Sequence, residues 1–472
     1  MNNRAIKNIV FLLALSTLAV KTFAPVRADS VDDYIKSQML KHRIPGLSVS
    51  VIQNGKVVKQ QGYGFSNVEL SVPATAETIY PIGSISKQLT AVSIMLLVRD
   101  KKINLDDAIK KYIDFLPLAW KSITIRELLN QTSGIPEWVP NPNKESLLKA
   151  CSIAEIVKHV QVKPLAFTPG TKFDYSNTNY NLLAGIIEKV SGEPYDVFLQ
   201  GHLIKPIGMG ATGTYDPQIT ISNRSAGYDR IQGNIYNNVF LYDPSYYAGA
   251  GSLESTVGDL AKWNAAILSG RIISPSVLSQ MWTPPHLPNG LKSDYGMGWI
   301  NQTFKGHRVI WHNGGIPGYT GFLGHFPDDN LTVIILSNMF PLDGFDDNPP
   351  FLSLGQSLAS FYVPSLAPVK ETILPEDSLV TALLKKVSGQ IALGTLDKSL
   401  FAPALRVQLT PAAVNPARDL LAPLGPLTSL TFLERSPDGA SSYQARYGTT
   451  AVNWIIAVDS NHSIYVLRPL PQ

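Results

Sequence analysis

The order of strand-like and helix-like segments most constrains what this chain can fold into. β-rich runs lie at both ends of residues 29–363, and helical runs lie between them. Near one end, Asn54-Gly55 separates the runs Gly46 to Ile52 and Lys56 to Gln61, which predicts a β-hairpin. Toward the other end four strands are predicted: Tyr295 to Ile300, Arg308 to His312, Gly321 to Phe326 and Leu331 to Asn338. The simplest fold is an α/β (α+β) domain whose N- and C-terminal strands share one antiparallel sheet, with a helical insertion as the other wall of a cleft.

A second, smaller domain is predicted after a linker. The 472 residues are enough for two domains, and 44% hydrophobic with 16% charged residues is typical of a globular protein. Residues 364–376 contain three prolines and are predicted to be the linker. In residues 377–472, helix-like segments come first and four short strand-like runs follow. This order predicts a small α+β accessory domain, in which no site is recognisable.

The first 28 residues have the pattern of a secretory signal peptide. Arg4 and Lys7 precede an apolar run from Ile9 to Val20, and Val26-Arg27-Ala28 fits a cleavage site. We therefore expect an exported protein, periplasmic or secreted, with no stable membrane insertion after cleavage. The alternative is an uncleaved membrane anchor, for which the apolar run is short.

Charge and cysteine content limit the classes of partner and the cellular compartments that fit this chain. Lys and Arg number 40 against 36 Asp and Glu, but four of the basic residues lie in the signal, so the remaining chain is formally neutral. Nothing in this balance favours a nucleic-acid partner. Cys151 is the only cysteine, which excludes an intrachain disulfide and is typical of a buried structural thiol.

The first sign of chemistry is Ser84-Ile-Ser-Lys87. The apolar segment Leu89 to Val98 that follows predicts a buried helix, on which residues three apart share one face. Ser84 would also lie at the positive end of the helix dipole, close to backbone N–H groups without helical partners. A hydroxyl with a proton acceptor beside it and donors for an oxyanion suits a nucleophile. Ser146-Leu-Leu-Lys149 has the same spacing, so the motif alone does not decide, although no catalytic residue types cluster around that copy.

Two further elements follow in a fixed order, Tyr175-Ser-Asn177 before a helical segment and His312-Asn-Gly314-Gly315 in a predicted strand. With Ser84-x-x-Lys87, this pattern resembles the penicillin-recognising serine hydrolases, in the branch of class C β-lactamases, DD-carboxypeptidases and related esterases. The resemblance covers roughly Ser30 to Tyr362. It extends beyond the motifs to three flanking segments: Leu128 to Pro136, Tyr295 to Trp299 and His312 to Tyr319.

The resemblance implies a role for each motif residue. Ser84 attacks a carbonyl and is acylated, and Lys87 and Tyr175 are the candidate bases for its proton. Both have ordinary pKa values near 10, so proximity and burial must shift them. Tyr175 would then serve the leaving group as an acid and the deacylating water as a base. Asn177 would bind a substrate amide, and the backbone N–H groups of Ser84 and Gly315 would form the oxyanion hole.

The chain departs from the β-lactamase pattern at His312-Asn313. Those enzymes usually have Lys-Thr there, both of which help to bind a substrate carboxylate, whereas a histidine is mostly neutral at pH 7. The resemblance still implies that His312, Asn313 and Gly314 contact substrate, although His312 also fits a strand histidine that is satisfied internally. The histidines have no metal-ligand spacing, and no nucleotide-binding fingerprint is present, so we expect neither a metal nor another cofactor.

The sequence thus predicts an exported serine hydrolase that forms an acyl-enzyme at Ser84 and hydrolyses an ester or amide. The substrate would be a small molecule or peptide: a D-amino-acid peptide, an ester or a β-lactam. One alternative is a penicillin-binding or sensor protein that is acylated without efficient turnover. Another is a structural homologue whose C-terminal module binds a partner, although every motif residue is intact. The natural substrate and the oligomeric state stay open at this stage.

Overall fold

The computed structural model describes residues 28–138, 149–231, 234–237, 243–288, 290, 293–341, 351–367, 376–435 and 440–470. It divides into two compact units, one ending at Leu366 and one beginning at Ala367. Nearly all of the predicted signal peptide, most of the predicted linker and the serine of the second Ser-x-x-Lys copy, Ser146, lie outside the described residues. In the described part of the chain, no helix has both the length and the apolar character needed to cross a bilayer.

The first unit is built on a seven-stranded sheet that joins the two ends of this unit. Its strand order is β3-β2-β1-β12-β11-β10-β9. The bounds are β1 Gly46–Gln53, β2 Lys56–Asn67, β3 Val72–Pro73, β9 Ile300–Phe304, β10 His307–Ile316, β11 Tyr319–Phe326 and β12 Leu331–Ser337. The N-terminal hairpin meets the C-terminal strands where β1 pairs antiparallel with β12. The predicted fold class, with strands from both ends in one antiparallel sheet, is confirmed.

One predicted strand, Tyr295 to Ile300, is wrong. Only an isolated bridge joins Tyr295 to Ile300, and β9 begins at Ile300. Between them Gly298 has a φ of +90°, and a Cβ there would lie 2.9 Å from the carbonyl oxygen of Lys87. A left-handed glycine packed this closely against another backbone interrupts the extended conformation that the apolar residues alone would favour.

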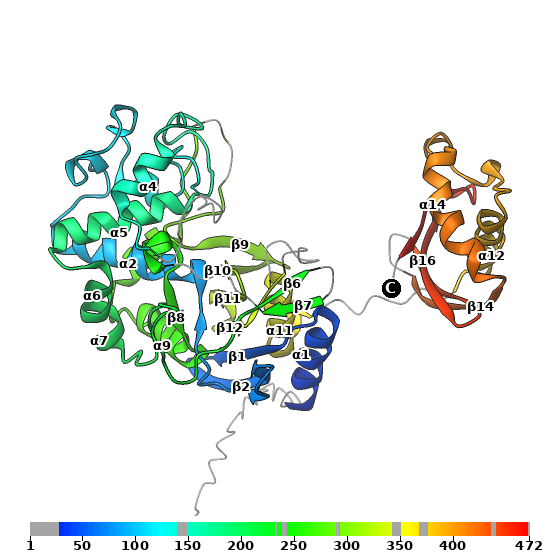
Figure 1. The fold of residues 1–472 in the computed structure, drawn as a ribbon, viewed down its shortest axis with the longest axis horizontal. Coiled ribbons are helices and arrows are strands. Elements are labelled where there is room, and N and C mark those ends of the chain that lie inside the picture. Colours follow the sequence, from blue (N-terminus) through cyan, green and yellow to red (C-terminus); the bar gives the residue numbers. More distant parts are fainter. Residues whose placement is uncertain are drawn as a thin grey trace, which may run out of the picture. The chain divides into compact units, whose positions relative to one another are not determined.

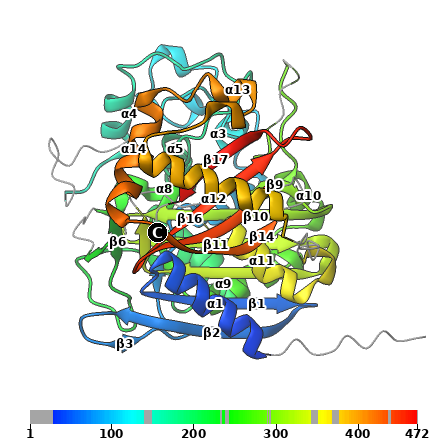
Figure 2. The same ribbon diagram turned by 90° about the vertical axis from the view of Figure 1, so that its right-hand side faces the viewer.

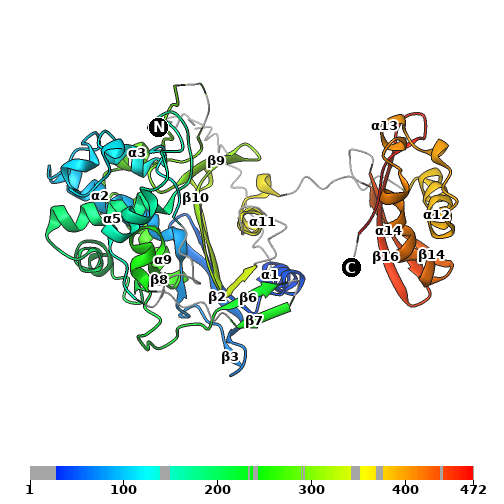
Figure 3. The same ribbon diagram turned by 45° about the horizontal axis from the view of Figure 1, so that its top comes forward.

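Helices cover both faces of this sheet. The central strands alternate their apolar side chains, so Ile310 and Ile334 enter one hydrophobic core while Val309 and Val333 enter another. The first core holds the helices α2 Ser86–Arg99, α5 Asn177–Ser191 and α9 Val257–Leu268. The second core holds α1 Ala28–His42 and α11 Leu352–Tyr362. Figures 1 and 3 show the sheet between these two groups.

Shorter elements complete the first unit. The remaining helices are α3 Ile125–Leu129, α4 Ile153–Val160, α6 Tyr195–Leu199, α7 Lys205–Ile207, α8 Ala248–Gly251 and α10 Pro275–Trp282. Two small sheets have the orders β4-β8-β5 and β13-β6-β7. Their strands are β4 Tyr80–Pro81, β5 Gly213–Thr214, β6 Tyr228–Ile231, β7 Asn234–Asn237, β8 Leu253–Ser255 and β13 Met339–Pro341.

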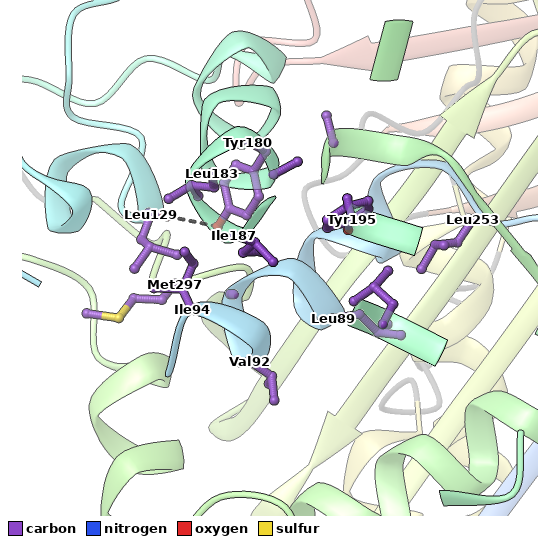
Figure 4. Packing of buried hydrophobic residues seen from close by; sticks show 14 of the residues in the cluster. Leu89, Val92, Ile94, Leu129, Tyr180, Leu183, Ile187, Tyr195, Leu253 and Met297 are labelled. Atoms are coloured by element: carbon purple, nitrogen blue, oxygen red, sulfur yellow. Dashed lines mark hydrogen bonds between the residues drawn. The ribbon is translucent and has the colours of Figure 1, made fainter. Parts of the chain in front are cut away.

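The packing of α2 against α5 fixes the position of the serine–lysine motif. Every residue of α2 from Ser86 to Leu97 is buried, as expected for a helix that is surrounded by other elements. Figure 4 shows Leu89 and Ile94 of α2 in one cluster with Tyr180 and Leu183 of α5. The Tyr180 hydroxyl donates a hydrogen bond to the Leu129 carbonyl oxygen at 2.9 Å, which ties α5 to α3.

The second unit has its own core. The helices α12 Ser378–Leu393, α13 Pro403–Arg406 and α14 Pro411–Leu421 come first in the chain. An antiparallel meander follows, in the order β14 Leu427–Arg435, β15 Ser441–Tyr447, β16 Thr450–Val458 and β17 Ile464–Leu470. Figure 2 shows α12 and α14 lying over this sheet, where Leu384, Tyr443 and Trp454 are buried. The predicted α+β class of this part of the chain is therefore confirmed.

Candidate active site

Three segments that are far apart in the sequence bring Ser84, Lys87 and Tyr175 together. Ser84 lies in the 3-10 turn Gly83–Ile85, directly before α2, and Lys87 lies in the first turn of that helix. The Lys87 Nζ is 3.0 Å from the Ser84 Oγ, and the Tyr175 hydroxyl is 2.9 Å from the same Oγ on its other side. Tyr175 lies two residues before α5, so the packing of α5 against α2 places the phenol over the serine.

Lys87 is fully buried, and this burial favours the neutral form of its amine. The Nζ is 2.7 Å from the Asn177 Oδ1 and 2.7 Å from the Ala250 carbonyl oxygen, both of which only accept hydrogen bonds. A neutral amine has two N–H donors and one lone pair. The two acceptors occupy both donors, which leaves the lone pair for the Ser84 hydroxyl. Burial lowers the pKa of Lys87 to about 7, against an opposing contribution from Glu137.

The pKa of Tyr175 is shifted in the opposite direction to that of Lys87. Burial raises the pKa of its phenol, and the negative charge of Glu137 raises it further, against a hydrogen bond to Ser84 that lowers it. The phenol therefore keeps its proton at neutral pH, and its O–H donates a hydrogen bond to the Ser84 Oγ. At pH 7 one neighbour of the Ser84 hydroxyl can accept a proton, and the other neighbour still carries one.

Asn177 is held by a residue that the sequence did not single out. One carboxylate oxygen of Glu137 accepts from the Asn177 backbone N–H at 2.5 Å, and the other accepts from the Asn177 Nδ2 at 2.7 Å. Glu137 follows Gly134-Ile135-Pro136, a segment that carried part of the family resemblance. The position of Glu137 directly after this segment was the one sequence feature that could have indicated a role in the site. No short motif, however, connects a glutamate in this loop to an asparagine 40 residues later.

The glycines of β10 let this strand touch the turn that carries Ser84. A Cβ on Gly314 would lie 1.9 Å from the Ile82 carbonyl oxygen and 3.4 Å from the Ser84 backbone nitrogen. A Cβ on Gly83, whose φ is +51°, would lie 2.9 Å from the Gly315 nitrogen. The backbones at Ser84 and Gly315 are therefore neighbours, and Gly315 is exposed while Gly314 is buried.

His312 is buried, and both of its ring nitrogens have partners. The Nε2 is 3.0 Å from the Tyr295 hydroxyl, and the Nδ1 is 2.6 Å from the Asn313 carbonyl oxygen. This pairing fits a neutral ring that donates from Nδ1 and accepts at Nε2. Burial, together with the charge of Lys87, lowers the pKa of His312 to about 3. The ring is thus an uncharged part of the wall beside Tyr175, and Asn313, half-buried, is the next residue of the strand.

The buried His312 leads to a prediction for stability. Below about pH 6.5 the unfolded chain binds a proton at this residue, whereas the folded protein does so only near pH 3, so stability falls as the pH falls between these values. For His312→Gln we expect the free energy of unfolding to lose about 2 kcal/mol less than the wild type does between pH 7 and pH 5. Urea unfolding at both pH values measures this. His286→Gln, at an exposed position, is the control. An equal loss in the wild type and in His312→Gln would contradict the prediction.

Two surface cavities of the described part of the chain lie away from the serine cluster. One, of about 430 Å³, is lined by residues such as Arg224 and Tyr319, and the other, of about 420 Å³, by residues such as Asp259 and Lys262. Within the described ranges, no three His, Cys, Asp or Glu side chains group in a way that could hold a metal ion.

Comparison with known proteins gives one family match. The family model described as Beta-lactamase matches residues 31–355. Protein flp of Staphylococcus aureus (strain MW2) is 28% identical over 330 residues, which are 66% of this chain and 62% of that protein. Penicillin-binding protein 4* of Bacillus subtilis (strain 168) is 29% identical over 63% of this chain and 69% of its own. Among solved structures, a D-stereospecific amidohydrolase from Streptomyces sp. is 25% identical with a TM-score of 0.56, over 66% of this chain and 94% of its own.

Proposed function

The chain belongs to the Beta-lactamase family, and from this premise we propose that it is a serine hydrolase that forms an acyl-enzyme at Ser84. The observation that carries the proposal is the pair of contacts to one hydroxyl: Lys87 Nζ at 3.0 Å and Tyr175 OH at 2.9 Å from the Ser84 Oγ. Two polar groups with oppositely shifted pKa values around the hydroxyl of a partly exposed serine are suited to acyl transfer.

In acylation, Lys87 takes the proton of Ser84 while the Oγ attacks the substrate carbonyl carbon. The carbonyl oxygen becomes an oxyanion, which accepts hydrogen bonds from the backbone N–H groups of Ser84 and Gly315. When this tetrahedral intermediate collapses, the bond to the leaving group breaks and Tyr175 gives its proton to that group. The acyl-enzyme then holds an ammonium at Lys87 and a phenolate at Tyr175.

Deacylation uses the same two groups in reverse. The Tyr175 phenolate takes a proton from water, and the resulting hydroxide adds to the acyl carbon. The Ser84 oxygen leaves and takes its proton back from Lys87, which restores all three side chains and releases the acid. The neighbouring ammonium and phenolate stabilise each other, which offsets the cost of forming both charges in a buried site.

For the substrate we propose an ester or amide: a D-amino-acid peptide, an ester or a β-lactam. A relative named as a penicillin-binding protein and a structural neighbour named as a D-stereospecific amidohydrolase support this range. The neutral His312, with both ring nitrogens engaged, supplies no cation for a substrate carboxylate. We therefore propose that Asn177 and the strand residues Asn313 and Gly314 contact the substrate. We also propose that the protein is exported, which the pattern of residues 1–28 supports.

Trapping of the acyl group tests this proposal. The protein is incubated separately with a labelled penicillin and with a p-nitrophenyl ester, digested, and mapped by mass spectrometry. We expect the acyl mass on the peptide that contains Ser84, with steady release of p-nitrophenol. A stable penicillin adduct without turnover of any ester or D-amino-acid amide would favour the penicillin-binding or sensor function instead. An adduct on another residue, or no adduct at all, would contradict the proposed nucleophile.

A further inference from the structure

We propose that Glu137 is a positioning residue that fixes the Asn177 amide with its oxygen toward Lys87, and thereby directs the lysine lone pair at Ser84. This inference rests on the proposed function and adds a residue to it. Glu137 lies in the loop after α3, outside the three sequence motifs, and acts only through Asn177.

The orientation of the Asn177 amide follows from its two neighbours. A carboxylate only accepts hydrogen bonds, so Glu137 requires the Nδ2 of Asn177 on its side. Lys87 has N–H groups to donate, so it requires the Oδ1 on the other side. The second oxygen of Glu137 accepts from the Asn177 backbone N–H at the first residue of α5, where a negative charge is also favoured by the helix dipole. The amide is therefore locked in one of its two orientations.

This lock determines where the Lys87 lone pair points. With the Asn177 Oδ1 and the Ala250 carbonyl oxygen both 2.7 Å from Nζ, a neutral amine gives one N–H to each, and its lone pair faces the Ser84 Oγ. If the amide were reversed, its Nδ2 would face Nζ. The amine would then turn its lone pair toward Asn177 and away from the serine, and the proton acceptor would be lost.

Glu137 is also the one charged group that acts on Lys87 among the described residues. The titratable side chains around the amine are Tyr175 and Tyr180, whose rings lie 4.8 and 5.5 Å from Nζ, and His312 with its partner Tyr295. Burial raises the pKa of all three tyrosines and lowers that of His312, so all four are neutral at pH 7. The charge of Glu137 favours the ammonium, so its removal lowers the pKa of Lys87.

The first variant, Glu137→Gln, removes the charge and puts an NH₂ group where only acceptors stood. We expect kcat/KM for a p-nitrophenyl ester to fall about 10²-fold, mainly through kcat, because general base catalysis contributes on the order of 10²–10⁴. The acidic limb of the pH profile, which reports the loss of the Lys87 proton, should move to lower pH. Glu137→Asp keeps an acceptor-only carboxylate and should recover much of the rate, with the limb near its wild-type position.

A double variant reverses the polarity of the pair and separates positioning from folding. In Glu137→Gln with Asn177→Asp, the new amide donates to the new carboxylate, which still accepts from Lys87. We expect kcat above that of the single Glu137→Gln variant. The acidic limb should now move to higher pH, because a carboxylate contacts the amine directly. Glu77→Gln, at an exposed residue of the same type, should leave the rate and the limb unchanged.

The Glu137 variants test the positioning role, whereas Ser84→Ala tests the proposed function, so the failure of one can be told from the failure of the other. If activity depends on Ser84 but Glu137→Gln leaves kcat and the acidic limb as in the wild type, the positioning role is wrong. If Glu137→Asp and the double variant lose as much as Glu137→Gln, with no movement of the limb in any of them, Glu137 serves only the fold of its loop and the proposal is overturned.

Discussion

Ser84→Ala is expected to abolish acyl-adduct formation and to lower hydrolysis of a p-nitrophenyl ester by about 10⁴-fold or more, as the loss of a nucleophile does in serine enzymes. The physical reason is that, among the described residues, Ser84 carries the hydroxyl that contacts both the Lys87 amine and the Tyr175 phenol. The free energy of unfolding should change by no more than about 1 kcal/mol, because the side chain is small and partly exposed. Ester hydrolysis, penicillin labelling and urea unfolding of the same preparation measure all three quantities.

The second Ser-x-x-Lys copy offers a matched control for this variant. Ser146→Ala changes the same atoms in the same spacing, and we expect wild-type activity and labelling. Activity that survives in Ser84→Ala, or that is lost in Ser146→Ala, would show that Ser84 is not the nucleophile. Either result would contradict the proposed mechanism.

Gly314→Ala is expected to damage both the fold and the chemistry. The added methyl group would lie 1.9 Å from the Ile82 carbonyl oxygen. Neither atom is at the end of a flexible side chain, so a change of rotamer cannot relieve the clash. The strand β10 must therefore move away from the turn that carries Ser84. Overpacking of this kind costs about 1–3 kcal/mol of stability. The move also displaces the Gly315 N–H from the proposed oxyanion position, which should lower kcat by about 10²–10³-fold.

Gly201→Ala is the control for the added methyl group. A Cβ at Gly201 meets no atom within 4 Å, so stability should be unchanged or slightly raised, and activity should be unchanged. Ester hydrolysis and urea unfolding of both variants provide the comparison. A Gly314→Ala variant with wild-type kcat would show that close approach of β10 to the turn is not needed for catalysis.

The sequence predicted most of the fold because the signals involved are local. Asn54-Gly55 between two apolar runs gave the β1–β2 hairpin, and the apolar run after Lys87 gave α2. The spacing of Ser84 and Lys87 also predicted their proximity, since residues three apart on a helical turn share a face. The strand predicted at Tyr295 to Ile300 failed because the left-handed Gly298 packs against the Lys87 carbonyl oxygen, a contact that no pattern of apolar residues records.

The parts of the candidate site that sequence reasoning missed depend on partners distant in the chain. Glu137 accepts a hydrogen bond from Asn177, 40 residues later in the chain. The Lys87 amine donates one to the carbonyl oxygen of Ala250, 163 residues later. The contact of His312 with substrate stays a prediction, and the hydrogen bond between its ring and Tyr295 is the part that the motif did not indicate.

The sequence by itself determined the helical turn that sets an amine beside a hydroxyl, the strand segments at both ends of the first unit, and the order of the three motifs. Those features follow from short-range sterics and from the periodic burial of side chains, which act between residues a few positions apart. Only the tertiary structure decided that the Tyr175 phenol lies over a serine 91 residues away, and that Lys87 is buried deeply enough to lose its charge near pH 7. Desolvation depends on everything that surrounds a group, so it exists only once the core has formed.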